Sequence, residues 1–362
     1  MGRLINIHYD NKPLYNINIE QDFSGLYAVF ESLGLKNRKI CILTDSTVGG
    51  HYLDTVMDIA RECTSKAVSY TFEAGEKSKN LDTIEDFYEQ LVTGHFDRND
   101  VIAALGGGVT GDMAGFAAAT YLRGIRVVQI PSSLLAMVDS SIGGKTGVDF
   151  RGYKNMVGAF HQPSAVYINV SMLSTLTDEQ YYSGFGEVVK HGIIRDAGYL
   201  DYIKNNYKGI NGRDFSVLEE IVAGSCNIKR AVVENDPEEK GERAILNFGH
   251  TLGHAIEKLK DFSMLHGECV SIGIAAAAYI SMRRGMLMQE EYNSICQVLK
   301  ELELPIKTDG LKAEDIINIS KSDKKMDAGK IKFILLNGMG NAVICNDVTD
   351  SEMLEALNTV LE

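Results

Sequence analysis

One segment of the N-terminal half carries most of the information about the fold: Val101-Ile102-Ala103-Ala104-Leu105-Gly106-Gly107-Gly108-Val109-Thr110-Gly111-Asp112. Its first five residues form a short apolar run, which is typical of a buried strand in a parallel sheet. The glycines that follow fit the pattern G-x-G-x-x-G, and residues 113–119 are compatible with a helix. This order predicts a loop whose backbone N–H groups approach a pyrophosphate at a helix N-terminus. The alternative is a tight strand-to-helix turn that binds no ligand.

The place of this loop in the chain differs from that in an ordinary dinucleotide-binding domain. There the loop follows the first strand, and an acidic residue comes about 20 residues later. Here the loop comes late, and the candidate acid, Asp45, ends an earlier strand-like run. We therefore predict a variant nucleotide-binding fold rather than the standard one.

The two halves of the chain differ in their hydrophobic patterns. In the first half, strand-like runs lie at residues 39–43, 101–105, 127–130 and 165–168, and helical patterns at 54–63 and 80–93. Alternating strands and helices predict a parallel sheet covered on both faces. In the second half, helical patterns lie at residues 178–194, 217–235, 251–260, 269–285 and 289–301, before a β-hairpin at 330–336 and 342–344. We predict an α/β Rossmann-like domain over residues 1–176 and a mostly α-helical domain over residues 177–362.

Composition narrows the class of partner. The chain has 362 residues, 45% of them hydrophobic, and a formal net charge of -13. This charge argues against nucleic acid and anionic membranes, which attract cationic surfaces, so a small ligand is favoured. No apolar run approaches the roughly 18 residues that a membrane span needs, and the six cysteines show no framework spacing. We expect a cytoplasmic protein with reduced cysteines.

Several residues of the second half could bind a metal ion. His250 and His254 are four residues apart and would project from one face of a helix. Glu187, His191 and His266 are further candidates. Three nitrogen and oxygen ligands with one open position suit catalytic Zn²⁺, although spacing leaves the third and fourth ligands open among His191, His254 and His266. The alternative is a set of hydrogen-bonded core histidines and a carboxylate on a helix surface.

A second glycine-rich loop, Asp139-Ser140-Ser141-Ile142-Gly143-Gly144-Lys145-Thr146, ends like a P-loop. It has Asp139 where the first glycine of that motif stands, which argues against a P-loop ATPase. Lys145 either meets an anionic ligand or is a solvated lysine after a turn. In so acidic a chain, cations within or beside glycine- and histidine-rich segments predict a phosphate or carboxylate substrate. These cations are Arg123, Lys145, Lys154, Lys190, Lys229, Arg243 and Lys325.

Three motifs together resemble one known family. They are residues 106–112, the block from Ile130-Pro131-Ser132-Ser133-Leu134-Leu135 through residues 139–148, and Asn247-Phe248-Gly249-His250-Thr251-Leu252-Gly253-His254-Ala255. In this order, and over nearly the whole chain, they resemble the 3-dehydroquinate synthases. The resemblance implies a Rossmann-like N-terminal domain, a helical metal-binding C-terminal domain, an active site between them and a homodimer.

The resemblance also implies two cofactors and the residues that hold them. By motif position, Zn²⁺, with Co²⁺ as an alternative, would be bound by Glu187, His250 and His266, which leaves His254 to contact the substrate. Family members often carry Thr-Thr where this chain has Ser132-Ser133, and sometimes an amide where it has Thr47. The residues implied for NAD are Asp45, Thr47, Glu76, Lys79, Gly107, Gly108, Val109, Asp112, Ser132, Ser133, Lys145, Lys154 and Thr175.

The reaction of the family is the second step of the shikimate pathway. It converts 3-deoxy-D-arabino-heptulosonate 7-phosphate into 3-dehydroquinate and phosphate through oxidation at C5 by NAD⁺, phosphate elimination, reduction, ring opening and intramolecular aldol closure. The resemblance implies that Lys229 and Arg243 hold the substrate carboxylate. The residues that it places around the substrate phosphate are Asn155, Asn247, His254, Arg123 and Lys325, with Lys324 as an alternative to Lys325. The residues left to hydrogen-bond the hydroxyls and anionic groups of the substrate are Asp139, Lys145, Lys190 and Glu239.

Two rival functions remain at this stage. Another sugar-phosphate cyclase or a metal-dependent NAD polyol dehydrogenase would have the same two-domain architecture. A polyol dehydrogenase, however, would not need so many cations. A nucleotide-binding regulator that has lost catalysis is disfavoured, because the metal, nucleotide and anion-binding sets are all present.

Overall fold

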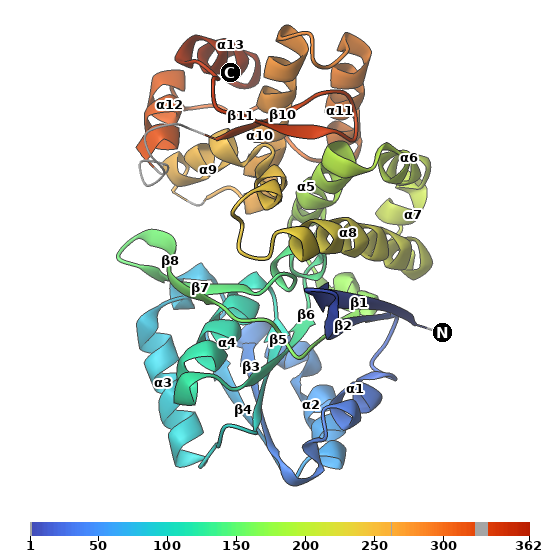
Figure 1. Cartoon of the computed structure of the whole chain (residues 1–362), viewed down its shortest axis with the longest axis vertical. Coiled ribbons are helices and arrows are strands. Elements are labelled where there is room, and N and C mark those ends of the chain that lie inside the picture. The colour runs from blue at the N-terminus through green and yellow to red at the C-terminus, as the bar shows by residue number, and fades with distance from the viewer. Residues whose placement is uncertain (1, 262, 323–331) are drawn as a thin grey trace. The chain divides into compact units, whose positions relative to one another are not determined.

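The structure, a computed structural model, describes residues 2–261, 263–322 and 332–362. The chain divides into two compact units (Figure 1). One consists of Met1–Thr175 and Phe215–Glu238, and the other of Leu176–Asp214 and Glu239–Glu362. Among the described residues, no helix is both long enough and apolar enough to cross a membrane.

The first unit is built on a seven-stranded sheet in the order β1-β2-β9-β6-β5-β3-β4. Its strands are β1 (Arg3–Tyr9), β2 (Lys12–Glu20), β3 (Lys39–Asp45), β4 (Lys66–Phe72), β5 (Val101–Gly106), β6 (Arg126–Pro131) and β9 (Ala165–Asn169). Neighbouring strands pair in parallel, except that β1 is antiparallel to β2. The predicted α/β class with a parallel sheet is confirmed. The β1–β2 hairpin is an addition that the hydrophobic pattern did not predict.

The strand order explains why the glycine loop comes late in the chain. β4 follows β3 and pairs with it on one side, whereas β5 returns to pair with the other side of β3. The register places Thr44 opposite Leu105, so the carboxyl ends of β3 and β5 adjoin. Ligands of open α/β sheets bind at such a reversal of strand order. Asp45 and Gly107 are therefore neighbours although they are far apart in sequence.

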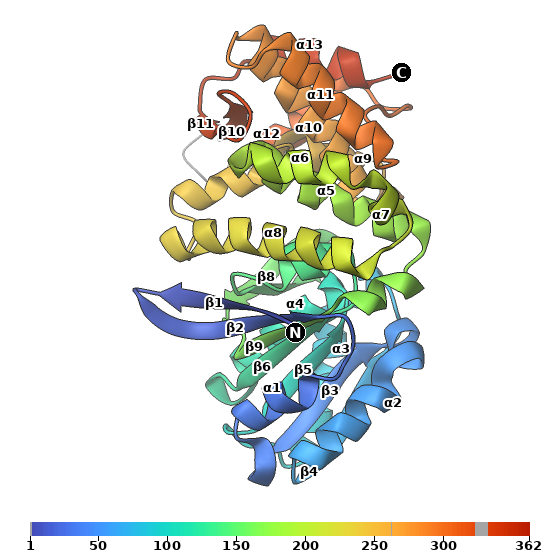
Figure 2. The same cartoon turned by 90° about the vertical axis from the view of Figure 1, so that its right-hand side faces the viewer.

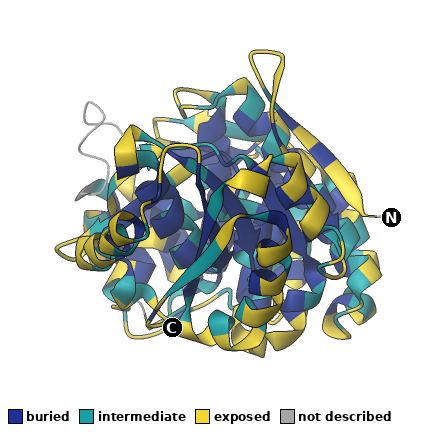
Figure 3. Cartoon of the chain, turned by 90° about the horizontal axis from the view of Figure 1, so that it is seen from below, coloured by how far each residue is buried: buried dark blue, intermediate teal, exposed yellow. Residues whose placement is uncertain are grey.

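Helices cover both faces of this sheet (Figures 1 and 2). α1 (Leu26–Ser32) packs with α2 (Ser46–Cys63) on one face, and α3 (Leu81–Thr93) packs with α4 (Gly108–Thr120) on the other. All six residues of β5 are buried, as expected of a strand covered on both sides. Figure 3 shows the buried strands in dark blue, inside a shell of more exposed helices. The hydrophobic core of the unit lies between these layers.

Short elements complete the first unit. The hairpin of β7 (Lys145–Phe150) and β8 (Tyr153–Phe160) packs on α4. A Cβ on Gly115 of α4 would lie 2.3 Å from Thr146 Cγ2, so a glycine is needed for the hairpin to approach the helix this closely. The remaining short helical turns are η1 (Leu35–Asn37), η2 (Glu76–Ser78), η3 (Tyr121–Arg123), η4 (Ala136–Ser140) and η5 (Val170–Thr175).

Helix α8 (Phe215–Asn235) corrects the predicted domain boundary. We placed a single boundary after residue 176, but α8 belongs to the first unit. Its apolar face, which includes Leu218, Ile221 and Val222, is buried, and the helix packs on β1, β2, η4 and η5 (Figure 2). A helical pattern reveals an apolar face but not the surface that covers it, so the sequence could not assign this helix to a unit.

The second unit is mostly helical, as predicted. Its elements are α5 (Asp178–Arg195), α6 (Ala197–Asn205), α7 (Tyr207–Asn211), η6 (Glu242–Asn247), α9 (His250–Leu259), α10 (His266–Arg283), α11 (Gln289–Glu301), α12 (Ala313–Ser322), α13 (Asp350–Val360), β10 (Phe333–Leu336) and β11 (Ala342–Cys345). β10 and β11 form the predicted antiparallel hairpin, while residues 330 and 331 lie outside the described residues. α10 is the central helix, since it contacts α5, α9, α11, α13 and β10.

The start of α10 differs from the prediction in a way that matters for the site. The apolar pattern predicted a helix from residue 269, but α10 begins at His266. The Glu268 carboxylate accepts a hydrogen bond from Leu265 N–H at 2.8 Å, which satisfies a donor ahead of the first turn. This contact extends the helix by three residues and makes His266 its first residue.

Candidate metal centre and nucleotide-binding loop

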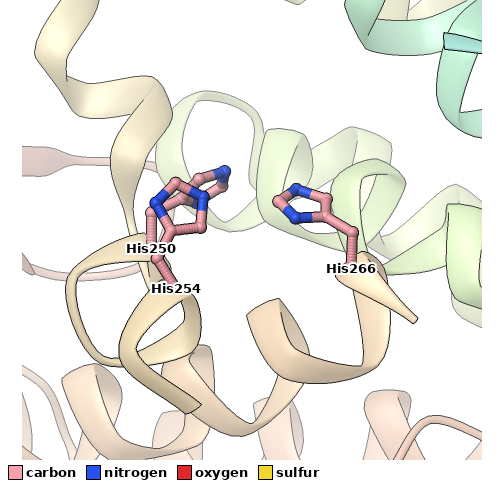
Figure 4. A group of neighbouring side chains, drawn as sticks. All are labelled: His250, His254 and His266. Atoms are coloured by element: carbon pink, nitrogen blue, oxygen red, sulfur yellow. The ribbon is translucent and has the colours of Figure 1, made fainter. Parts of the chain in front are cut away.

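Three histidines and one glutamate converge in the second unit. His250 and His254 lie one turn apart in α9, His266 begins α10, and Glu187 lies in α5. The histidine rings face one another (Figure 4), and one ligand atom from each lies within 4.8 Å of the others. Glu187 Oε1 is 3.5 Å from His250 Nε2 and 3.7 Å from His266 Nε2. The fold therefore brings all four side chains to one place.

Close backbone packing produces this convergence. Glu187 and His266 each adjoin a glycine at the crossing of α5 and α10, where a Cβ on Gly267 would lie 1.8 Å from Ser183 O. His250 likewise follows Gly249, whose carbonyl oxygen would lie 1.9 Å from a Cβ on Gly273. Only residues without a side chain permit such helix separations. The glycines that flank the candidate ligands thus set the distances between the helices that carry them.

Hydrogen bonds fix which nitrogen of each ring faces the centre. His250 Nδ1 lies 3.2 Å from Phe248 O, and His266 Nδ1 lies 3.2 Å from Glu257 Oε2. Carbonyl and carboxylate oxygens are acceptors, so we assign the proton of each neutral ring to Nδ1. The Nε2 lone pairs of both rings then point toward Glu187 Oε1. Metal-ligating histidines are commonly supported through their second nitrogen in this way.

The centre is short of positive charge at the point where these atoms meet. Glu187 is fully buried, and its Oε2 is paired with Lys190. Its Oε1 accepts no hydrogen bond from any side chain or backbone group that the structure describes. With Zn²⁺ bound at the usual N and O distances, tetrahedral ligand atoms stand about 3.4 Å apart, close to the distances observed. The donor set therefore fits a divalent cation.

The pKa values of the candidate ligands are shifted by burial and by the charges around them. Burial, together with the charge of Lys190, lowers the pKa of His250 well below its ordinary value. Burial also acts against protonation of His266, but the neighbouring carboxylates of Glu187 and Glu257 outweigh it and raise its pKa to about 9. Burial alone would raise the pKa of Glu187, yet Lys190 holds it well below its usual range. The centre therefore stabilises one added cation, either a proton on His266 or a metal ion.

The remaining histidine candidates lie differently. The His254 side chain is exposed, and its ring centroid is 4.9 Å from that of His250 and 5.6 Å from that of His266. His254 is thus close enough to be an alternative ligand or to meet a molecule bound at the metal. His191 is fully buried one turn beyond Glu187 in α5. Proximity alone does not choose between Glu187 and His254 as the third ligand.

Other predicted residues of this unit lie on the segment that leads to His250. Asn247 Nδ2 donates to Glu239 Oε1 at 2.9 Å, and Arg243 in η6 is 2% exposed. A buried guanidinium is costly unless it is paired, so Arg243 is a structured cation rather than a solvated one. Lys324 and Lys325, the two alternatives for a further phosphate contact, lie outside the described residues.

The glycine loop of the first unit opens helix α4. Gly107 is the N-cap and Gly108 the first helical residue, and the N-cap has no side chain that could accept from the N–H groups of the first turn. A Cβ on Gly107 would lie 3.5 Å from Ser133 Oγ, and one on Gly108 would lie 3.2 Å from Ser140 Oγ. The predicted Ser133 hydroxyl and the Ser140 hydroxyl, which was not predicted, are therefore beside the loop, at a helix N-terminus that favours an anion. Ser132 is buried, and its N–H donates to Gly106 O at 2.9 Å.

Asp45 has a structural role, while the nucleotide contact expected of it stays a prediction. One of its oxygens accepts from the backbone N–H groups of Thr47 and Val48, both at 2.9 Å, and so caps α2. The other oxygen lies 3.4 Å from Thr110 Oγ1, in the first turn of α4. The contact between Thr47 and Asp45 is therefore made by the backbone N–H of Thr47. This cap also explains why α2 begins at Ser46 instead of at residue 54, where the periodic pattern starts.

A buried ionic network adjoins the loop. Lys79 Nζ, on a residue that is 5% exposed, donates to Asp112 Oδ2 at 2.7 Å and to Asn155 Oδ1 at 2.6 Å. Burial raises the pKa of Asp112, while Lys79 opposes this shift. Asp112 and Asn155 also line a cavity of about 350 Å³ with Lys145 and with Phe160 of β8. The cavity is thus lined by Asp112, which was predicted for the nucleotide, by Asn155, which was predicted for the substrate, and by Lys145, which was predicted for both.

The structure also locates the remaining predicted residues of this unit. Lys154 Nζ is 3.5 Å from Glu76 Oε1, and Thr175 Oγ1 is 2.8 Å from the Tyr52 hydroxyl of α2. Val109 lies in the first turn of α4. Lys229 Nζ of α8 donates to both the backbone and the carboxylate oxygen of Asp139, each at 2.6 Å.

Arg123 is not brought to the glycine loop. It is exposed in η3, beyond the C-terminal end of α4, whereas the loop lies at the N-terminal end. A helix of this length spans about 20 Å. The predicted contact of Arg123 with the substrate phosphate stays a prediction, which this position within the first unit neither supports nor contradicts.

Sequence reasoning missed one residue of the metal centre, Glu257. It stands seven residues after His250 and three after His254, so all three share one face of α9. That spacing was a signal that could have been used. Its contact with His266 depends on the packing of α9 against α10, which the spacing does not show.

Comparisons with known proteins agree with this architecture. The family description "3-dehydroquinate synthase N-terminal" matches residues 69–183, and "3-dehydroquinate synthase C-terminal" matches residues 184–326. Among curated relatives, the 3-dehydroquinate synthase of Ruminiclostridium cellulolyticum is 43% identical over 94% of this chain and 94% of the relative. That of Acetivibrio thermocellus is 40% identical over 97% of each. A solved 2-epi-5-epi-valiolone synthase from Streptomyces hygroscopicus, with NAD⁺ and Zn²⁺ bound, is 25% identical with a TM-score of 0.88 over 99% of this chain and 98% of that one. The chain belongs to the 3-dehydroquinate synthase family.

Proposed function

We propose that the chain converts 3-deoxy-D-arabino-heptulosonate 7-phosphate into 3-dehydroquinate and phosphate, using NAD transiently. The observation that carries the proposal is the cluster of Glu187, His250 and His266, whose Oε1 and Nε2 atoms converge at the separations of a metal centre. In a chain that belongs to this family over nearly its full length, such a cluster supports a working enzyme rather than a regulator that has lost catalysis. The activity is that of a phosphate-eliminating carbon–oxygen lyase in aromatic amino acid biosynthesis.

We propose Zn²⁺, or Co²⁺ in its place, at Glu187, His250 and His266, and NAD at the glycine loop of the first unit. NAD held at this loop would supply a hydride acceptor and donor for C5, and a metal ion held by these three side chains would supply the Lewis acidity that acidifies the hydroxyl and polarises the ketone. Three protein ligands would leave an open position for substrate oxygens. His254 is not a metal ligand in our proposal, and its exposed ring is suited to contact the substrate.

The protein's own residues supply charge and orientation for a doubly anionic substrate. In the second unit, Arg243 suits the carboxylate, and Asn247, held by Glu239, suits phosphate oxygens. In the first unit, Lys145 and Asn155 line the cavity beside Asp112. Lys229, held by Asp139, adds a buried cation. Contacts or burial fix four of these groups, Arg243, Asn247, Asn155 and Lys229, which reduces the entropy lost when a substrate binds.

One assay tests the function against its rivals. The purified protein is incubated with heptulosonate 7-phosphate, catalytic NAD⁺ and Zn²⁺, and both phosphate release and absorbance of NADH are followed. We expect phosphate release in large excess over NAD⁺ with no net NADH. Stoichiometric NADH from a simple polyol would instead establish a dehydrogenase, and silence in both assays would favour a regulator.

The metal affinity of the protein should rise with pH. In the metal-free protein the pKa of His266 is raised to about 9, above the ordinary value of about 6.5, so His266 carries a proton at neutral pH that the metal must displace. The apparent dissociation constant for Co²⁺ should fall about tenfold per pH unit between 7 and 9 and then level off. Chelator competition across this range measures it, and a flat profile would contradict the assigned proton.

Replacing Asp45 by asparagine should weaken NAD⁺ without unfolding the first unit. Asparagine caps a helix about as well as aspartate, so α2 should persist, while the negative charge that would accept the ribose hydroxyls is lost. We expect NAD⁺ affinity to fall about tenfold and discrimination against NADP⁺ to decrease, since one charge-assisted hydrogen bond contributes roughly 1.5 kcal/mol. Isothermal titration with both nucleotides measures this. Unchanged affinities for both would remove Asp45 from the nucleotide site.

We also propose a cytoplasmic homodimer. The support is the family, whose phosphorylated substrate and cofactor belong to central biosynthesis. Sedimentation of the purified protein should give about twice the 39.8 kDa of one chain.

A further inference from the structure

We propose that Glu257 is a positioning residue that holds His266 in the orientation and tautomer of a metal ligand. This inference rests on the proposed function and deepens it, because it names the group that prepares the metal centre. The geometry that carries it is the 3.2 Å contact between Glu257 Oε2 and His266 Nδ1, on the side of the ring opposite the Nε2 that faces Glu187.

His266 needs such support more than His250 does. As the first residue of α10 it lies at a helix end, and its side chain is 29% exposed, against 12% for His250. A half-exposed imidazole can rotate and can carry its proton on either nitrogen. A carboxylate that accepts from Nδ1 prevents both the rotation of the ring and the transfer of the proton to the other nitrogen. The ionised oxygen can only accept a hydrogen bond, so it keeps the proton on Nδ1.

Glu257 is itself held in place. Its side chain is 7% exposed, and it lies on the same face of α9 as His250. α9 packs closely on α10, where a Cβ on Gly253 would lie 2.8 Å from Cys269 O. The helix that carries Glu257 is therefore fixed against the helix that carries His266, and the distance between the two side chains is set by backbone contact rather than by flexible rotamers.

Glu257 also supplies negative charge that would balance part of the positive charge of the proposed ion, which Glu187 alone does not balance. One oxygen of Glu187 is paired with Lys190, so the positive charge of that lysine offsets the one carboxylate among the three proposed ligands. Glu257 brings a second buried negative charge to the far side of His266. A divalent ion in a buried site is stabilised by such charge, and carboxylates behind ligating histidines raise metal affinity by about 10- to 100-fold.

The test compares Glu257→Gln and Glu257→Ala with the full-length wild-type protein. Each is titrated with Co²⁺ against a chelator, and the visible absorption of the bound ion reports its coordination. We expect the alanine variant to bind Co²⁺ about 100-fold more weakly and the glutamine variant about 10-fold more weakly, with a changed spectrum in both. Glu291→Gln is the matched control, because Glu291 accepts from Met288 N–H at the start of α11 and should leave Co²⁺ binding unchanged.

The outcomes separate this inference from the proposed function. If Glu257→Ala fails to fold, Glu257→Gln decides, since it keeps the size and an accepting oxygen. Wild-type affinity and spectrum in a folded glutamine variant, with phosphate release intact in the wild type, would overturn the role of Glu257 alone. Absence of both Co²⁺ binding and phosphate release in the wild type would overturn the proposed function, and the inference with it. Equal weakening by Glu291→Gln would show a general loss of stability and would also overturn the positioning role.

Discussion

Replacing His266 by alanine is expected to abolish metal-dependent phosphate release while the protein stays folded. His266 contributes Nε2 at 3.7 Å from Glu187 Oε1, and its loss would leave two of the three proposed ligands. Metal polarisation of an alcohol or ketone contributes several kcal/mol to the transition state, so kcat/KM should fall by at least about 10³-fold. Because the side chain is partly exposed at the start of α10, little packing is lost. Metal content, phosphate release and circular dichroism of the purified variant measure the three parts of this prediction.

His254→Ala is the informative comparison. It removes a neighbouring imidazole from the same cluster, yet in our assignment it should leave one metal ion per chain and lower turnover only. The opposite result, in which His254→Ala loses the ion and His266→Ala or Glu187→Gln retains it, would show that the three histidines hold the metal. That outcome is structurally accessible, since ligand atoms of all three lie within 4.8 Å of one another.

The sequence predicted the elements of the fold better than their arrangement. Strands such as β5 were predictable because residues buried on both faces give an uninterrupted apolar run, and α11 was predictable because one face of a helix recurs with a period near 3.6. Neither pattern records which strands are neighbours. The adjacency of β3 and β5, which brings Asp45 to Gly107, follows from a crossover that hydrophobic periodicity does not encode.

The same limit applies to the candidate metal centre. His250 and His254 could be paired from their spacing, because one helix carries both. Glu187 and His266 belong to other helices, and the sequence offered them only as two of several candidates until the resemblance to a family was used. The reason is physical: the separation of α5, α9 and α10 is set by glycines that a pattern search treats as breaks in a helix, not as contacts.

That reasoning leads to the second large effect, for Gly267→Ala. A Cβ on Gly267 would lie 1.8 Å from Ser183 O and 2.6 Å from Ser183 C, which are backbone atoms of α5. They cannot move aside as a side chain would, so α5 and α10 must separate, and Glu187 must move away from His266. We expect about 3 kcal/mol of destabilisation, at the upper end for overpacked cores, together with at least tenfold weaker Co²⁺ binding. Urea unfolding of the metal-free protein and chelator competition measure the two effects.

Gly50→Ala supplies the control for adding a methyl group to a helical glycine. Gly50 lies in α2, and beyond its own helix no heavy atom of the described residues lies within 4 Å of its built Cβ. Alanine there should therefore be neutral or stabilising by about 0.5–1 kcal/mol, through helix propensity and a less flexible unfolded chain. Opposite signs at the two positions would attribute the loss in Gly267→Ala to the crossing of α5 and α10. If Gly267→Ala were as stable as the wild type and bound Co²⁺ equally well, the glycine contact could not be what sets the spacing of the metal ligands.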